Sequence, residues 1–344
     1  MRRFWIYQVL ILIFAGCIDR IEVDTTVEPE RLIVEGFITN LPSEYKIKLS
    51  RTIRFSNERN MPVSGAIVSI LSADGDVHCF DETLTGSYIS CFDYQVKPNI
   101  TYKLRIEWEG KIIESTEQIL PEETHFNNLN YIPGERIYLR KLDSKVVHEP
   151  GVYITTLLPE TSGKRYYRWR LFPTFIFEAD RARSSEVERC WVAPIYEFKD
   201  VYIHEDVEGQ GGYDKGITFI PTSRDMAIYY SLLVEQYSIS EEAYTYWNSL
   251  KKQKENIGSI FDTPPFSINS NMQNIEDPSD IVLGYFGVYN VRELRMKWNL
   301  EDLPFKIYKS SLCSEIVRGE PRECFNCLRF PRGLVTNEQP DWWE

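Results

Sequence analysis

Two neighbouring segments are the clearest structural signal in the sequence: Arg31-Leu32-Ile33-Val34-Glu35-Gly36-Phe37-Ile38-Thr39 and, after a short break, Tyr45-Lys46-Ile47-Lys48-Leu49-Ser50. In the second segment Tyr45, Ile47 and Leu49 alternate with polar residues. An alternation with a period of two predicts a strand with one buried face. The first segment has the Ile, Val and Phe content that strands favour. We therefore expect the folded part of the chain to begin as a β-sheet.

Strand-like sequence continues to about residue 121. Further strands are expected at 62–70, 77–82, 87–92, 101–108 and 111–115. Seven or so short strands in about 90 residues, separated by turn residues, predict an immunoglobulin-like β-sandwich over residues 29–121. One of the turns, Asp74-Gly75-Asp76, has carboxylates that suit calcium. It lacks the other ligands of an EF-hand loop, and we interpret it as a turn.

One disulfide follows from the geometry of a predicted hairpin. The strands at 77–82 and 87–92 are joined across Thr83-Leu84-Thr85-Gly86, and a hairpin centred on Thr85 places Cys79 directly opposite Cys91. Opposed residues in an antiparallel pair have Cα atoms about 4.5–5.5 Å apart, a separation that a disulfide accepts. We expect Cys79 and Cys91 to be bonded.

The other cysteines of the folded part are Cys190, Cys313, Cys324 and Cys327. An even number of cysteines in an exported chain indicates disulfides, and we expect Cys190 to reach the C-terminal cluster. Cys324-Phe325-Asn326-Cys327 also has the spacing of a zinc or thioredoxin-type motif. No histidine follows it to complete a zinc ligand set, and Pro321 and Pro331 do not suit a redox-active helix start. Structural disulfides are the favoured interpretation.

Residues 122–344 predict a second β-rich domain, with aromatic-rich strands such as 166–172 and 229–237. It carries one amphipathic helix at about 240–257 and a cysteine-rich, disulfide-tied C-terminal segment. Ser240 suits the N-cap, Glu241 and Glu242 suit the first turn, and lysines follow in the last turns. Its apolar face, consisting of Ala243, Trp247, Leu250 and Ile257, is expected to dock on a sheet.

The N-terminus has the layout of an export signal. Met1-Arg2-Arg3 precedes an apolar run from Phe4 to Phe14, which is shorter than the roughly 20 residues of a membrane-spanning helix. Ala15 and Gly16 then precede Cys17, an arrangement that resembles the lipobox of bacterial lipoproteins. We expect residues 1–16 to be a lipoprotein signal peptide, Cys17 to be lipidated, and residues 17–28 to form an acidic tether. The alternative is an ordinary signal peptide that happens to contain a cysteine.

Composition excludes some functions. The net charge of −12 argues against a nucleic-acid partner, which requires a basic face. None of the four histidines belongs to a zinc-protease motif, and no nucleophile-elbow motif is present. We therefore expect no catalytic residues, no metal and no cofactor, although a carboxylate pair for glycoside hydrolysis stays open among the 51 acidic residues. Aromatic residues make up 14% of the chain, and both a glycan-stacking surface and sheet core packing use them.

A series of short motifs carries a family resemblance. They are Val34-Glu35-Gly36-Phe37-Ile38, Pro62-Val63-Ser64-Gly65-Ala66, Cys190-Trp191, Glu242-Ala243-Tyr244, Gly258-Ser259-Ile260-Phe261-Asp262, Leu283-Gly284-Tyr285-Phe286 and Pro340-Asp341-Trp342. In this order, behind the lipobox, the chain resembles a Bacteroidota outer-membrane lipoprotein family known only as a domain of unknown function. The resemblance implies genes beside TonB-dependent receptors, and it supplies no catalytic residues.

These observations lead to three hypotheses about function. The first is a non-enzymatic accessory or ligand-binding subunit of a TonB-dependent nutrient uptake system. It would be lipid-anchored in the outer membrane, on the periplasmic or cell-surface face, with a receptor barrel as partner and a glycan, a peptide or another nutrient as ligand. The second is a surface adhesion or envelope-structural lipoprotein. The third is a glycan-active hydrolase.

Overall fold

The computed structural model describes residues 30–53, 60–123, 125–140, 143–183, 185–194, 198, 200–207, 212–226, 228–255, 267–305 and 321–343. The predicted signal peptide, Cys17 and the acidic tether lie outside these residues, as do Cys313, the 258–262 motif and the predicted helix end at Ile257. No helix among the described residues has the length and apolarity that crossing a bilayer requires.

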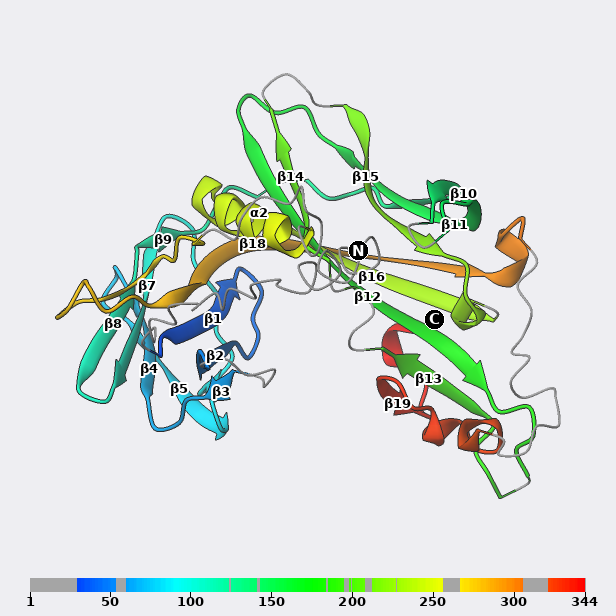
Figure 1. Cartoon of the computed structure of the whole chain (residues 1–344), viewed down its shortest axis with the longest axis horizontal. Helices are drawn as coiled ribbons and strands as arrows, with labels where there is room; N and C mark the ends of the chain where they lie inside the picture. Colours follow the sequence, from blue (N-terminus) through cyan, green and yellow to red (C-terminus); the bar gives the residue numbers. More distant parts are fainter. Residues whose placement is uncertain are drawn as a thin grey trace, which may run out of the picture.

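The chain forms two β-rich lobes (Figure 1). The first lobe contains β1 (Leu32–Thr39), β2 (Lys46–Arg51), β3 (Met61–Pro62), β4 (Ile67–Ser72), β5 (Val77–Leu84), β6 (Ser87–Ser90), β7 (Thr101–Trp108), β8 (Lys111–Ser115) and β9 (Gln118–Ile119). Its path of paired strands is β17-β8-β7-β4-β5-β6-β2-β1-β18, where β17 (Met272–Asn274) and β18 (Leu283–Asn299) come from much later in the chain, and the strands form a sandwich-like fold around one core. The prediction of a mainly β fold with an N-terminal β-sandwich is confirmed.

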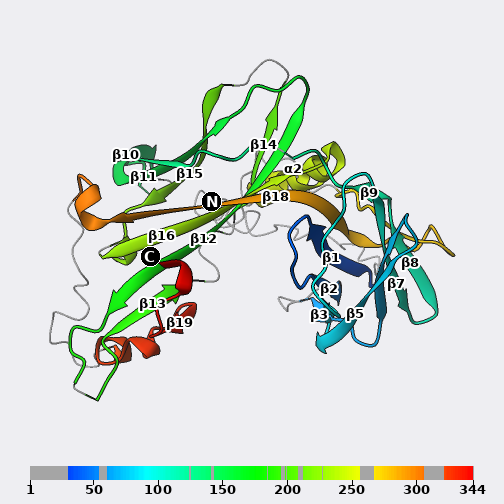
Figure 2. The same cartoon turned by 180° about the vertical axis from the view of Figure 1, so that it is seen from behind.

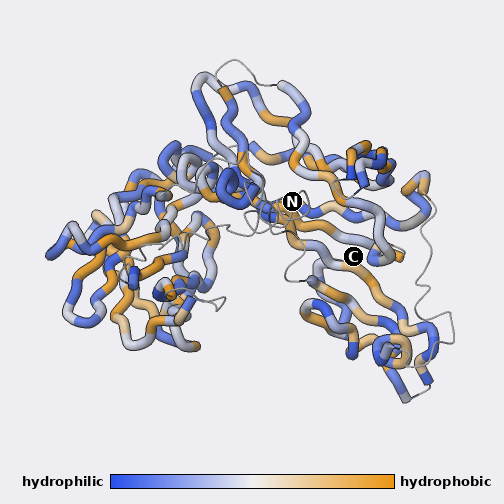
Figure 3. The backbone as a smooth tube through the Cα atoms, viewed as in Figure 1, coloured by the Kyte–Doolittle hydropathy of each residue, from blue (hydrophilic) through white to orange (hydrophobic). Residues whose placement is uncertain are grey.

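The alternation in β2 follows the prediction. Tyr45, Ile47 and Leu49 are buried in the core of the first lobe, while Lys46 and Lys48 are exposed on the opposite face of the strand. Burial of one face by apolar side chains thus fixes where the two lysines point. In Figure 3 many of the apolar residues lie on the strands of both lobes.

Two segments from far along the chain complete the first lobe. β17 (Met272–Asn274) pairs with β8, and the first half of β18 (Leu283–Asn299) pairs with β1 in parallel, from Ile33 opposite Leu283 to Thr39 opposite Tyr289. The backbones of β1 and β18 approach so closely at Gly284, where φ is +102°, that a Cβ atom there would lie 1.9 Å from the Val34 carbonyl oxygen. The predicted domain boundary at residue 121 does not include this return of the chain. Parallel pairing across some 250 residues leaves no local signal in either strand.

The second lobe consists mainly of long strands. They are β10 (Asn130–Leu139), β11 (Val146–Leu158), β12 (Arg165–Glu178), β13 (Arg189–Ala193), β14 (Tyr202–Asp206), β15 (Tyr213–Pro221), β16 (Tyr229–Ser238) and β19 (Leu334–Thr336). β10, β11 and β15 form a separate three-stranded sheet, whereas the second half of β18 pairs with β16 and so continues the main sheet into this lobe. Seen from behind, β18 runs as one strand through both lobes (Figure 2).

The strand β18 changes partner where the two lobes meet. After Tyr289 it leaves β1, and at Asn290 it joins β16, opposite Ser238. At the next residue, Val291, the Asn40 side chain bonds to the β18 backbone in place of β1. The Asn40 side-chain oxygen accepts from the Val291 amide at 2.6 Å, and the Asn40 side-chain amide donates to the Val291 carbonyl at 3.3 Å. Both backbone groups are therefore satisfied at the crossing.

The helix α2 (Glu241–Glu255) lies over this crossing (Figure 1). Its predicted N-cap is confirmed, because the Ser240 hydroxyl accepts from the Ala243 amide at 3.1 Å. Ala243 is fully buried, in a cluster that includes Tyr166, Tyr237, Tyr285 and Tyr289. The helix thus docks on the sheet at the junction of the lobes, as its apolar face predicts.

Two disulfides lie wholly within the described residues. Cys79 and Cys91 are bonded as predicted, with Cα atoms 5.7 Å apart and the Cys91 amide donating to the Cys79 carbonyl. Cys190 is bonded to Cys327, with Cα atoms 5.6 Å apart, and this bond ties β13 to the C-terminal segment. Cys324 is also disulfide-bonded, so the structural interpretation of the Cys324–Cys327 motif is confirmed and the zinc and thioredoxin interpretations are not supported.

The carboxylates of the turn at 73–76 are paired with a lysine. The Ser72 hydroxyl and the Lys97 ammonium both bond to Asp74, and Lys97 also lies 3.6 Å from Asp76. These contacts lower the pKa of Asp74 to about 2, with the Ser72 hydroxyl as the largest cause. One lysine therefore offsets part of the negative charge of the turn that resembles a calcium loop.

Candidate functional site

A cavity with a volume of about 700 Å³ lies between the two lobes, and we call it the interlobe pocket. One wall comes from β1 and β2 of the first lobe, the other from β12, β16 and β18, and α2 closes one side. The volume is within the range of about 300–1,000 Å³ that is usual for small-molecule sites.

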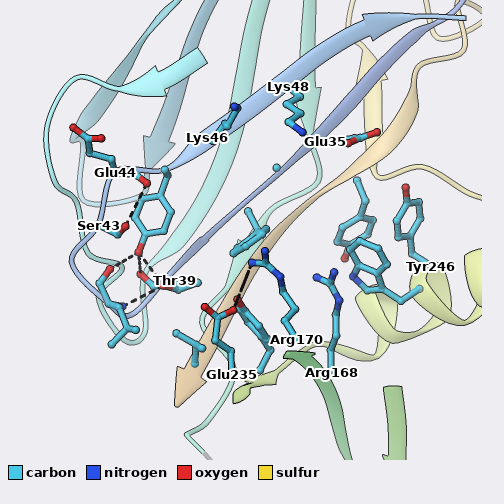
Figure 4. A pocket seen from close by; sticks show the side chains of 18 of the residues that line it. Glu35, Thr39, Ser43, Glu44, Lys46, Lys48, Arg168, Arg170, Glu235 and Tyr246 are labelled. Atoms are coloured by element: carbon cyan, nitrogen blue, oxygen red, sulfur yellow. Dashed lines mark hydrogen bonds and ion pairs between the residues drawn. The ribbon is translucent and has the colours of Figure 1, made fainter. Parts of the chain in front are cut away.

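Two arginines extend into the pocket from β12. In this strand Tyr167, Trp169 and Leu171 face the core of the second lobe, so Arg168 and Arg170 lie together on the other face. Figure 4 shows the two side chains next to each other, with Lys48 and Glu35 on the opposite side of the pocket. The alternation of the strand alone therefore brings the two guanidinium groups to one place.

Arg170 is paired with an acidic side chain and with a hydroxyl group. Directly across the pairing with β16 is Glu235, and the guanidinium lies 3.5 Å from its carboxylate. Arg170 also donates to the Tyr237 hydroxyl at 3.2 Å, while that hydroxyl donates to Glu235. The three side chains form a closed ion-pair and hydrogen-bond cluster, which we call the Arg170 cluster.

Arg168 is in a different situation. Its guanidinium carbon lies 3.7 Å from the centre of the Trp247 ring, a stacked cation–π contact. Its Nη1 atom is buried and has no hydrogen-bond partner within the described part of the chain, and no ion pair to Arg168 is found there. Burial lowers the pKa of Arg168.

The walls of the pocket combine lysines with aromatic rings. Lys46 and Lys48 reach it from β2, and Glu35 of β1 pairs directly opposite Lys48. Phe37 packs edge-on against Tyr237 with ring centres 5.7 Å apart. On α2, Tyr246 stacks on Tyr285 at 4.9 Å, and burial, followed by the charge of Glu35, raises the pKa of Tyr246 to about 12.

Glu235 and Glu293 bring acidic groups into the same pocket. They are opposed across the β16–β18 pairing, and Glu293 is exposed whereas Glu235 is mostly buried. Burial raises the pKa of Glu235, and the charge of Arg170 opposes that shift. The pocket therefore contains a carboxyl group that resists ionisation beside one that is open to solvent.

No sequence motif indicates the residues of this pocket. The strand at 166–172 is predicted from its aromatic residues, and the two arginines that alternate with them indicate a polar face. Trp247 and Leu250 belong to the predicted docking face of the helix: Trp247 packs against the buried cluster around Ala243 and also lines the pocket, and Leu250 lines the pocket. The disulfide cysteines lie elsewhere and do not contribute to it.

No metal-binding site is found among the described residues. Among them, no group of three or more His, Cys, Asp or Glu side chains is placed to hold a metal ion. His204 contacts the Tyr213 hydroxyl at 2.7 Å, and that hydroxyl donates to the fully buried Asp206. This chain of contacts is in the second lobe and does not line the interlobe pocket.

Comparison with known proteins gives a family but no characterised relative. No curated protein matches the chain. Among solved structures, a DUF4785 family protein from Legionella pneumophila is similar at 11% identity and a TM-score of 0.17, over 60% of this chain and about half (52%) of that chain. A likeness at that level supports no conclusion about fold or function.

The sequence profile of one protein family matches residues 18–295, which is most of the folded chain. The matched region includes both walls of the interlobe pocket, from Glu35 on β1 to Glu293 on β18. The chain therefore belongs to the family described as "Domain of unknown function (DUF4249)".

Proposed function

We propose that this protein is a lipid-anchored, non-enzymatic binding subunit of the outer membrane, which captures a small ligand in the interlobe pocket. The observation that carries the proposal is the pocket itself, which is walled by both lobes and lined by aromatic rings, two arginines, two lysines and four glutamates. Sites for small organic ligands likewise combine apolar surface with convergent polar groups. The sequence features around Cys17 supply the expected anchor.

We further propose that the protein hands its ligand to a TonB-dependent receptor barrel. This part of the proposal rests on the lipobox and on the family resemblance of the sequence. A lipid anchor would keep the pocket within reach of a membrane partner, because the protein then diffuses in two dimensions beside it. The ligand would be a nutrient for the receptor.

The experiment is a comparison of the wild type with Cys17→Ser in the native host. Each is expressed with a C-terminal affinity tag, and membranes are solubilised in mild detergent. We expect the wild type to incorporate a fatty-acid label and to co-purify with a receptor barrel identified by mass spectrometry, and Cys17→Ser to appear in the soluble fraction. A wild-type protein that is unlabelled, or labelled but recovered without a receptor, contradicts the corresponding part of the proposal.

A specific observation favours a second candidate, a glycan-active hydrolase. Glycosidases use two neighbouring carboxyl groups, one of them with a raised pKa. Burial raises the pKa of Glu235, and Glu293 is opposed to it on the neighbouring strand in the pocket. The test is turnover of polysaccharides by the purified protein. Hydrolysis that is abolished by both Glu235→Gln and Glu293→Gln would replace the non-enzymatic proposal.

A further inference from the structure

We propose that the ligand of the interlobe pocket carries a carboxylate group, and that Arg168 is the residue that receives it. This inference rests on the proposed function, and it names the chemical class of ligand for that same site. It starts from a contrast between two arginines that are two residues apart on one face of β12.

The contrast lies in how the two charges are compensated. Arg170 has Glu235 at 3.5 Å and the Tyr237 hydroxyl at 3.2 Å. The contacts of Arg168 within the described chain are instead with ring faces, that of Trp247 at 3.7 Å and that of Tyr237 at 5.9 Å. A guanidinium has five N–H donors, and a buried donor without an acceptor destabilises the fold. The Nη1 atom of Arg168 is such a donor within the described chain. A buried arginine without an acidic partner is typical of a binding site in which the ligand supplies the counter-ion.

The geometry around Arg168 suits a carboxylate. A guanidinium carbon 3.7 Å over the Trp247 ring favours a guanidinium plane parallel to the ring, with the N–H groups pointing along that plane. A guanidinium edge presents two parallel N–H groups that match the two oxygens of a carboxylate. The Arg170 cluster fills the adjacent position, and its Glu235 carboxylate keeps a second anion from binding there.

The other lining residues indicate the chemistry of the rest of the ligand. Phe37 and Tyr246 are half-buried, so parts of their rings are accessible from the pocket. Such rings pack against the apolar face of a sugar ring or against an aliphatic or aromatic side chain. Lys46 and Lys48 are exposed on the opposite wall, and Glu35 and Glu44 line that wall beside them. The affinity for an anion is therefore assigned to Arg168 and not to the net charge of the pocket. A cavity of about 700 Å³ accepts one or two sugar or amino-acid units.

A carboxylate of this kind occurs in uronic acids and at the C-terminus of short peptides. The experiment therefore uses two matched pairs of probes with the full mature chain in detergent: D-glucuronate against D-glucose, and phenylalanyl-alanine against its C-terminal amide. Isothermal titration calorimetry measures each Kd. We expect the carboxylate to bind at least tenfold more tightly than its neutral counterpart in at least one pair, and that pair identifies the source. Equal affinities within both pairs, or no binding of any of the four probes, overturn the inference.

Three variants test the role of Arg168 itself. Arg168→Met keeps the apolar stem against Trp247 and should abolish the preference for the carboxylate, while Arg168→Lys, which keeps the charge without the planar fork, should retain part of it. Without ligand, Arg168→Met should leave the thermal midpoint unchanged or raise it, because it removes an uncompensated charge. Arg170→Met should lower the midpoint, because it leaves Glu235 without its cation.

A carboxylate preference that survives in Arg168→Met overturns the assignment. So does a midpoint for Arg168→Met that falls as far as that of Arg170→Met, since Arg168 would then be an ordinary structural cation. These measurements use purified protein and do not depend on the anchor or on a receptor. A failure here is therefore distinguishable from a failure to recover the receptor from membranes.

Discussion

Glu82 and Glu235 show how the surroundings of a single side chain set its ionisation. The Glu82 carboxylate accepts from the Gly65 amide at 2.9 Å, the Gly86 amide at 3.0 Å and the Ser64 hydroxyl at 2.8 Å. These bonds favour the ionised form, and they lower the pKa of Glu82. Glu235 is buried in the pocket wall, and burial raises its pKa despite the nearby Arg170.

Opposite shifts predict opposite pH dependence of stability. A carboxyl group with a raised pKa in the fold stabilises it below the ordinary pKa, near 4.5, and that stabilisation is lost as the pH rises through the folded value. A lowered pKa stabilises the fold above the ordinary value, and the stabilisation is lost as the pH falls through the folded value. Relative to Glu235→Gln, the wild type should therefore lose stability as the pH rises from about 4 to 7.

Glu82→Gln is the matched control with the opposite sign. Relative to Glu82→Gln, the wild type should gain stability as the pH rises from about 3 to 5. Urea denaturation of the wild type and both variants across this range measures the differences in the free energy of unfolding. Parallel curves for the wild type and Glu235→Gln would show that Arg170 and Tyr237 fully offset the burial of Glu235.

At the scale of single elements, α2 carries two rings of the pocket, Tyr246 and Trp247, and its start is set by one side chain. The Ser240 hydroxyl bonds to the Ala243 amide at 3.1 Å, and Glu241 and Glu242 in the first turn complement the helix dipole. Replacing a serine N-cap by alanine typically costs about 1 kcal/mol. We expect Ser240→Ala to lower the free energy of unfolding by about that amount.

Ser249→Ala is the control for this prediction. Ser249 is in the interior of the same helix, where its hydroxyl donates to the Thr245 carbonyl at 2.9 Å, and alanine is a better helix former there. Its effect should stay within about 0.5 kcal/mol. Urea denaturation measures both variants, and equal losses would contradict a capping role for Ser240.

The elements that the sequence predicts best are those with a local pattern. The alternation in β2, the turn that joins β5 to β6, and the cap and charges of α2 all act within a few residues of one another, and each is confirmed. The apolar run that ends at Tyr289 is part of a longer strand, β18, which continues to Asn299. In its second half Arg292 and Glu293 are exposed, and Glu293 lines the pocket, so the pattern of a buried strand fades there.

At the scale of the whole molecule, the arrangement depends on contacts between distant parts of the chain. The interlobe pocket joins residues near 35–48, 168–170, 235–237 and 246–250. Each group follows from a local pattern, but their meeting depends on β18, which pairs with β1 and then with β16. Such a meeting has no signature in a single sequence. The mainly β class was therefore predictable, while the position of the site was not.

The two described disulfides constrain the whole molecule to different degrees. Cys190 and Cys327 are 137 residues apart in sequence, whereas Cys79 and Cys91 are 12 apart. If a disulfide stabilises chiefly by restricting the unfolded chain, the longer loop contributes about 5 kcal/mol and the shorter about 3 kcal/mol. Packing acts in the same direction, because Cys190 and Cys327 are fully buried while Cys79 and Cys91 are exposed.

The double variant Cys190→Ala/Cys327→Ala should therefore lose more stability than Cys79→Ala/Cys91→Ala. Alanine avoids placing a new hydroxyl in the buried cluster that Cys190 and Cys327 share with Ala179. Guanidinium denaturation under oxidising conditions compares the two variants with the wild type. An equal or smaller loss for the long-range pair would mean that the C-terminal segment is held by its other contacts, such as the Trp191–Trp343 ring contact at 6.4 Å and the bond from Lys297 to the Trp343 carbonyl. A larger loss for Cys190→Ala/Cys327→Ala would instead indicate that the Cys190–Cys327 disulfide is the main link between the last residues of the chain and the sheet of the second lobe.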